Sequence, residues 1–273
     1  MKYFVKRRVR SLLILAAIIG VAFLLVAILE VALRSTAVLT GVVLLVVMLV
    51  LTFFNARKKL PFLPLLRAST WLQIHIYVGL FSVVLFLLHI GFRLPQGRLE
   101  IVLSVLFAVV AVSGVLGLLI SRWLPNRMAR SGEAVIYERI PSHQQGLTEE
   151  AERIVREAEV STGASAISDF YFAELAPYFR GSGGVALIFG SEYRQQHQMQ
   201  ERLDAFGRYL DDKEKEVVAK LRDCIERKRN LDFQRAAQKL LKLWLFVHIP
   251  FTYSLLIVAF VHAWIALAYA GSL

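Results

Sequence analysis

Five apolar segments, each about as long as a bilayer is thick, limit this chain to a membrane-protein fold. A helix needs about 20 apolar residues to cross the hydrocarbon core. The segments cover residues 12–33, 37–54, 71–92, 101–120 and 243–270. The first follows a basic stretch, as in a secretory signal, but its apolar run is too long for one. We therefore expect five transmembrane helices, including a retained first helix.

The remaining residues form one polar insert, so three parts are predicted. Residues 1–122 hold four helices, 123–242 form a mostly helical domain, and 243–273 hold the fifth helix. Within the insert, 133–141 has the composition of a short strand, Thr148 is a candidate helix cap, and 185–189 is expected to be a strand or buried segment. Two long helices are expected between 191 and 242, separated near Asp211 and continued into the fifth apolar segment.

The basic residues lie where a membrane protein would place them. The net charge is +11, which on its own would also fit a nucleic-acid-binding protein. Basic residues are concentrated before the first apolar segment, between the second and third, and after the fourth: Lys2, Lys6, Arg7, Arg8, Arg10, Arg57, Lys58, Lys59, Arg67, Arg122, Arg127 and Arg130. The positive-inside rule then predicts a multi-pass inner-membrane protein with a cytoplasmic N-terminus, a cytoplasmic insert and an outer C-terminus. No nucleic-acid partner is expected.

Two pairs of histidines with the same spacing lie inside the third and fifth apolar segments. His75 and His89 are 14 residues apart, as are His248 and His262. Fourteen residues make almost four helical turns, so each pair shares one helix face and is separated by about 21 Å. The third and fifth helices run parallel, so His75 and His248 lie near the cytoplasmic side. His89 and His262 lie near the outer side.

This arrangement predicts two b-type haems, each with an imidazole on both axial positions of the iron. The metal ligands would be His75 with His248 and His89 with His262, inside a four-helix-type bundle. Arg93, one turn beyond His89 on the same face, would meet a haem propionate or snorkel to the membrane surface. Small residues on the same faces would let the macrocycle approach the helices: Gly79, Ser82, Thr252 and Ala259. Small residues also permit close helix packing, the alternative for these positions and for Ser113, Gly114 and Gly117.

Other patterns narrow the chemistry. The single cysteine, Cys224, excludes a four-cysteine iron–sulfur cluster and a CxxCH haem attachment within this chain. The glycine-rich residues 181–184 lead into Val-Ala-Leu-Ile-Phe, not into the helix that a phosphate-binding loop requires. His143 and His197 lie in polar sequence and are expected to be solvated.

The histidine pattern resembles two known groups of membrane proteins. One is cytochrome b of bc-type complexes, and the other is the transmembrane domain of ferric reductases and NADPH oxidases, whose third and fifth helices supply comparable pairs. The resemblance covers about residues 71–122 and 243–270 and carries over to His75, His89, His248 and His262. The chain has neither a GxGxxG nucleotide motif nor the Pro-Glu-Trp-Tyr quinol motif.

We therefore expect a transmembrane electron carrier, an electron-transfer subunit of an oxidoreductase complex. Its expected partners are membrane lipid, a cytoplasmic flavoprotein or iron–sulfur subunit, a periplasmic c-type cytochrome, and quinone as a further candidate. Two alternatives stay open: a subunit that itself oxidises or reduces quinol, and a haem-free anchor or transporter whose histidines relay protons.

Overall fold

All described residues of the computed structural model are helical or lie in short connections, so the predicted all-α class is confirmed. The structure describes residues 2–31, 36–53, 68–128, 135–162, 165–181, 183–189, 193–208 and 210–270, and no strand occurs within these ranges. The chain divides into two compact units, residues Met1–Leu118 with Leu245–Leu273, and residues Leu119–Trp244. Several of the basic residues named above lie outside the described residues: Arg57, Lys58, Lys59, Arg67 and Arg130, together with the side chains of Lys2, Lys6, Arg7 and Arg8.

The first unit consists of apolar helices. Its elements are α1 (Lys2–Val31), α2 (Thr36–Thr52), α3 (Ala68–His89) and the apolar parts of α4 (Arg98–Met128) and α9 (Asp212–Ala270). By length and composition, α1, α3, α4 and α9 could each cross a membrane. α2 is equally apolar, but its 17 residues reach only about 26 Å, less than the hydrocarbon core of about 30 Å. These helices indicate a membrane protein.

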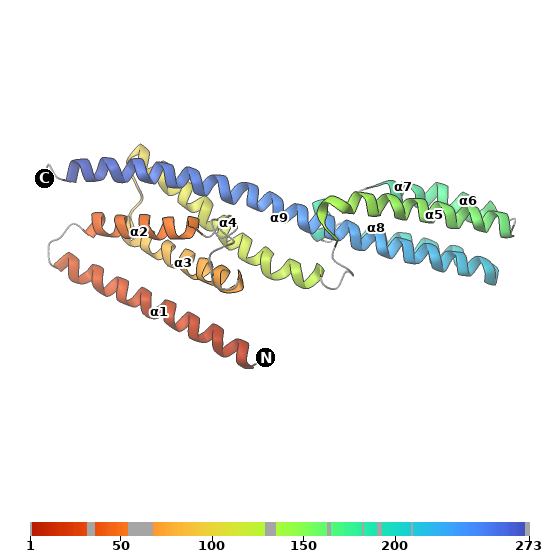
Figure 1. Cartoon of the computed structure of the whole chain (residues 1–273), viewed down its shortest axis with the longest axis horizontal. Helices are drawn as coiled ribbons and strands as arrows, with labels where there is room; N and C mark the ends of the chain where they lie inside the picture. Colours follow the sequence, from red (N-terminus) through yellow and green to blue (C-terminus); the bar gives the residue numbers. More distant parts are fainter. Residues whose placement is uncertain are drawn as a thin grey trace, which may run out of the picture. The chain divides into compact units, whose positions relative to one another are not determined.

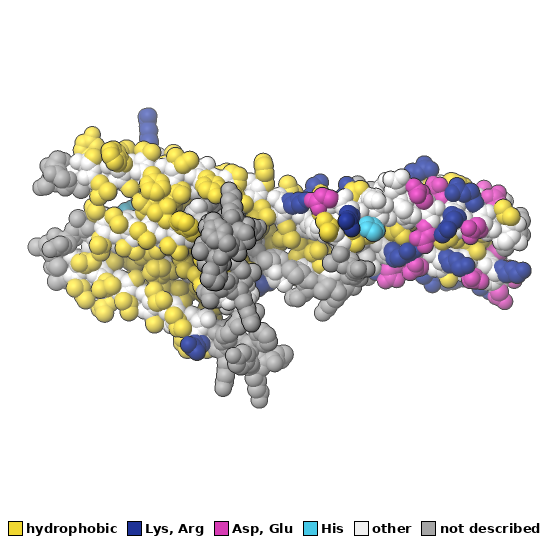
Figure 2. Space-filling view, viewed as in Figure 1, with side chains coloured by type: hydrophobic (Ala, Val, Ile, Leu, Met, Phe, Trp, Pro, Cys, Tyr) yellow, Lys and Arg dark blue, Asp and Glu magenta, His cyan; other side chains and the backbone are white. Residues whose placement is uncertain are grey.

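Four of the five helices contribute to a common core in the first unit. Leu44 of α2, Leu85 of α3, Phe107 of α4 and Leu255 of α9 are all buried in one cluster. Phe86 stacks on Phe107 with ring centroids 4.2 Å apart. α1 contacts α2 and α3 (Figure 1). The outward faces are apolar in this unit (Figure 2), as expected of helices that face lipid.

A glycine turn ends α3 immediately after its second histidine. The amide of Gly91 donates to the carbonyl of Leu88, and that of Phe92 donates to the carbonyl of Leu87. This is a Schellman motif, and Gly91 has the positive φ of 58° that the motif needs. The predicted helical extension to residue 92 is therefore wrong. So is the placement of Arg93 on the helix face of His89, because the chain has already left the helix.

The second unit packs several short helices against the polar ends of α4 and α9. These are η2 (Tyr137–Arg139), α5 (Ile140–Thr162), α6 (Ser165–Phe170), the π-helical segment η3 (Tyr171–Leu175), α7 (Ala176–Arg180), η4 (Val185–Phe189) and α8 (Tyr193–Gly207). The predicted break near Asp211 is present, and α9 then continues unbroken into the apolar segment. Glu214 accepts from the Asp211 amide, a capping-box contact that starts α9.

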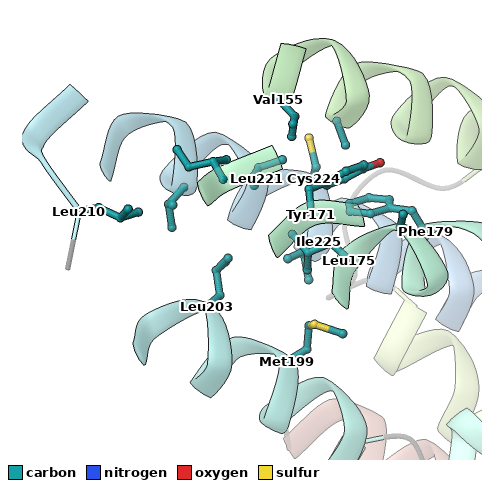
Figure 3. Close-up of a cluster of buried hydrophobic side chains, with 14 residues drawn as sticks. Val155, Tyr171, Leu175, Phe179, Met199, Leu203, Leu210, Leu221, Cys224 and Ile225 are labelled. Carbon is teal, nitrogen blue, oxygen red and sulfur yellow. The ribbon is translucent and has the colours of Figure 1, made fainter. Parts of the chain in front are cut away.

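A hydrophobic core and one buried ion pair hold the second unit together. Figure 3 shows Tyr171 beside Cys224 of α9, and the ring of Phe179 lies 6.1 Å from that of Tyr171 in the same buried cluster. Elsewhere on α9, Nζ of Lys228 lies 2.6 Å from Oδ2 of Asp232 and donates to the carbonyl of Gly181 at 2.8 Å. Their side chains are only 1% and 4% exposed, so this pair is shielded from water. Charged side chains cover the outside of this unit (Figure 2).

Three local predictions within the insert are wrong. Within the described part of 133–141, the chain forms η2 and the start of α5, not a strand. Thr148 lies inside α5, where its hydroxyl donates to the carbonyl of Gln144 at 3.0 Å. Residues 185–189 form a 3₁₀ helix, although Ile188 is buried as expected. The first two errors have one cause: α5 begins at Ile140, with Pro141 in the first turn, where proline is well tolerated.

Candidate functional site

The structure brings the histidines of α3 and α9 together as two pairs within the first unit. The rings of His89 and His262 have centroids 6.3 Å apart and an interplanar angle of 80°. His75 lies near enough to His248 to interact with it electrostatically. All four side chains are half-buried. Each histidine of α3 therefore has its neighbour at the corresponding position of α9.

α2 packs against the imidazole of His89. Its Nδ1 lies 3.0 Å from the carbonyl oxygen of Ala37 and 3.3 Å from Oγ1 of Thr40. The ring also lies directly against Gly41, where an added Cβ would be 2.8 Å from Cε1 of His89. Glycine at this position is what permits the close approach of ring and helix.

α4 holds His248 in a comparable way. Nδ1 of His248 lies 2.8 Å from Oγ of Ser113, which is itself buried. The next residue, Gly114, is less tightly packed, because an added Cβ would lie 3.7 Å from Cε1 of His248. His75 has a different neighbour, the backbone of Leu51 on α2. A small pocket beside it is lined by Val50, Leu51, Trp71, Ile74, His75 and Val78.

The other five residues predicted to contact a cofactor differ in burial and in their hydrogen-bond partners. Gly79 has open space beside it, since an added Cβ would meet nothing within 4 Å. Ser82 is buried and donates to the carbonyl of Gly79 at 2.7 Å. Thr252 donates to the backbone carbonyl of His248 at 2.7 Å, not to its ring. Ala259 is half-buried and Arg93 is exposed. Cofactor contacts of these five residues stay predictions.

Sequence reasoning missed the residues that hold the imidazoles. Ala37, Thr40 and Gly41 were not singled out, and Ser113 was noted only as a small residue, with no link to a particular histidine. The small-residue signal found Ser113 and Gly114 on α4. For α2 there is no comparable signal, because its place beside α3 comes from tertiary packing.

Each histidine pair offers two imidazole donors. Among the described residues, no group of three or more His, Cys, Asp and Glu side chains could hold a metal ion. Two imidazoles alone are too few for a bare zinc ion, which takes at least three protein ligands. They are the number required when a planar macrocycle supplies the other four nitrogens. His143 is exposed on α5, and His197 lies outside the side chains that the structure describes.

Comparison with known proteins adds no further constraint: no protein-family model, curated protein or solved structure matches this chain.

Proposed function

We propose that this chain is a membrane electron carrier that binds two b-type haems, each between one histidine of α3 and one of α9. The observation that carries the proposal is the separation of His89 and His262. An imidazole nitrogen binds a metal at about 2.0–2.1 Å, and the ring centroid lies about 1.1 Å behind that nitrogen. Two imidazoles on opposite sides of one metal therefore have centroids about 6.3 Å apart. The observed separation is 6.3 Å.

The chain's part in this function is to hold and orient the ligands. When bound, haem supplies one-electron oxidation and reduction, and two histidine ligands favour electron transfer over oxygen activation because no axial position is open. α3 and α9 supply one imidazole each to both pairs. Gly79 lies between the two histidines of α3, and no side chain fills the space directly beside it, since an added Cβ would meet nothing within 4 Å.

The charge pattern supports a topology for this carrier. We place the N-terminus and residues 123–242 in the cytoplasm and the C-terminus outside, by the positive-inside rule. His75 and His248 would then form the cytoplasmic-side site, and His89 and His262 the outer-side site. Electrons would pass between a cytoplasmic flavoprotein or iron–sulfur subunit, or membrane quinone, and an outer acceptor such as a periplasmic c-type cytochrome. The resemblance to ferric reductases and to bc-type cytochrome b supports the same reading.

The test is a haem count on the purified protein. A pyridine haemochrome assay with a dithionite-reduced spectrum should give about two b-type haems per chain with low-spin α bands. If the protein is folded and comes from haem-replete cells but contains no haem, the proposal is overturned and the proton-relay or anchor alternatives are favoured.

Single substitutions then test the pairing. His75→Ala and His248→Ala should remove the same haem, and His89→Ala and His262→Ala the other. His143→Ala, on the exposed surface of α5, is the matched control and should retain both. If His75→Ala and His262→Ala removed the same haem, the pairing would be wrong.

A further inference from the structure

Two hydroxyl side chains, one on α2 and one on α4, contact a histidine of each pair in the same way. Oγ1 of Thr40 lies 3.3 Å from Nδ1 of His89, and Oγ of Ser113 lies 2.8 Å from Nδ1 of His248. Each hydroxyl also donates to a carbonyl of its own helix. Thr40 donates to Thr36 at 2.7 Å, and Ser113 donates to Val110 at 2.9 Å.

This shared geometry fixes the direction of the hydrogen bond to each imidazole. A hydroxyl has one hydrogen and two lone pairs. When the helix carbonyl takes that hydrogen, the oxygen presents a lone pair to the histidine, and Nδ1 is the donor. For His89 the carbonyl of Ala37, 3.0 Å from Nδ1, requires the same, since a carbonyl can only accept. A neutral imidazole with its hydrogen on Nδ1 has its free lone pair on Nε2.

We infer that Thr40 and Ser113 are positioning residues that prepare Nε2 of His89 and of His248 to bind haem iron. The inference rests on the proposed function and deepens it. Histidines that bind metals commonly donate their other N–H to an oxygen, which fixes the tautomer and the ring plane and makes the ligand more basic. The two hydroxyls contact different helices in the two pairs: Thr40 contacts the α3 histidine of one pair, and Ser113 contacts the α9 histidine of the other. Each proposed haem therefore has one ligand oriented by a hydroxyl.

The two sites differ in how much depends on the hydroxyl. His89 donates toward both Ala37 and Thr40, so it keeps a backbone acceptor when the hydroxyl is removed. The contact is also shorter at the other site: Oγ of Ser113 lies 2.8 Å from Nδ1 of His248, whereas Oγ1 of Thr40 lies 3.3 Å from Nδ1 of His89. Removing an acceptor lowers the basicity of the imidazole and destabilises ferric haem more than ferrous haem. The potential of that haem should rise, and Ser113→Ala should have the larger effect.

The test is a redox titration of the holoprotein with low-temperature electron paramagnetic resonance of the ferric haems. Ser113→Ala should raise the midpoint potential and change the signal of the haem that His75→Ala removes, leaving the other unchanged. Thr40→Val should do the same, more weakly, to the other haem. Second-shell changes typically weaken metal sites by 10- to 100-fold, and a tenfold preference for the ferrous form corresponds to about 59 mV. Ser113→Thr and Thr40→Ser retain the hydroxyl and should restore the wild-type values.

A matched control separates this role from helix packing. Thr52 is on α2 and donates to the carbonyl of Met48 at 2.9 Å, so Thr52→Val removes the same kind of bond without changing an acceptor to a histidine. It should move neither potential. Loss of one haem in folded Ser113→Ala, restored by Ser113→Thr, would also support the inference.

Two results would overturn the inference. One is two bound haems whose potentials and signals are the same in Ser113→Ala and Thr40→Val as in the wild type. The other is misfolding of Ser113→Ala and also of Ser113→Cys, a change that retains a side chain of similar size but with a weak acceptor. Wild-type protein without haem is a different failure, because it removes the proposed function itself.

Discussion

Replacing Gly41 with alanine should weaken one haem site and leave the other intact. The added Cβ would lie 2.8 Å from Cε1 and 3.3 Å from Nδ1 of His89, whereas ordinary van der Waals contact begins at 3.4 Å. The ring must then move by about 0.6 Å, which strains the hydrogen bond between Nδ1 and the carbonyl of Ala37. Overpacking of this kind costs about 1–3 kcal/mol, which is about a 5- to 150-fold loss of affinity.

The neighbouring glycine on α4 gives a control with the same chemical change. In Gly114→Ala the new Cβ would lie 3.7 Å from Cε1 of His248, an ordinary contact that requires no movement. Alanine favours a helix over glycine by about 0.5–1 kcal/mol, so neither change weakens its own helix. Haem should be titrated into each variant purified from haem-limited cells, with the pyridine haemochrome assay giving the stoichiometry. Wild-type affinities at both sites in Gly41→Ala, or equal losses in the two variants, would refute the steric argument.

The second unit offers three further predictions, each checked in detergent-solubilised protein. Lys228→Met should lower the free energy of unfolding by about 3–5 kcal/mol because it leaves Asp232 buried and uncompensated; in a circular dichroism melt, adding Asp232→Leu should recover most of the loss, and equal melting of the single and double variants would contradict this. Burial raises the pKa of Tyr171 to about 12 from 10.0, so this residue's contribution to stability should be complete below pH 10 and lost as the pH rises toward 12. The melting temperature of the wild type should therefore fall relative to that of Tyr171→Phe only between pH 10 and 12, and a gap that does not change with pH would contradict this. Burial also raises the pKa of the Cys224 thiol, so maleimide should label this single cysteine only once the unit unfolds, and rapid labelling of folded protein would show that the thiol is accessible.

Apolar length and charge were enough to predict the helical class and the continuity of α9. Segment length is a strong signal because a membrane helix must satisfy its own backbone, and about 20 residues are needed to span. The same signal overextended α3 by three residues, where Gly91 should have been recognised as the end of the helix. In the insert, the apolar residues near Tyr137 looked like a strand because short apolar runs do not distinguish the two structures.

Helical periodicity placed each histidine pair on one face, and the structure places the rings of His89 and His262 side by side. Periodicity could not find Thr40, which lies 49 residues from His89, or assign Ser113 to His248, which follows it by 135 residues. Such contacts depend on which helices pack against one another, and helical periodicity in one sequence does not identify those neighbours. Whether the four histidines bind haem stays a prediction.

The placement of each ligand pair on α3 and α9 has a consequence for biogenesis. Both pairs join residues that are 173 positions apart in the chain. At typical synthesis rates of about 5–20 residues per second, about 9–35 s separate the appearance of the first ligand of a site from the second. During that interval His89 already has its α2 acceptors, whereas Ser113 still lacks its histidine. On the proposed assignment, stable haem insertion therefore follows the completion of α9, and protein synthesis sets the earliest time at which the chain becomes redox-active.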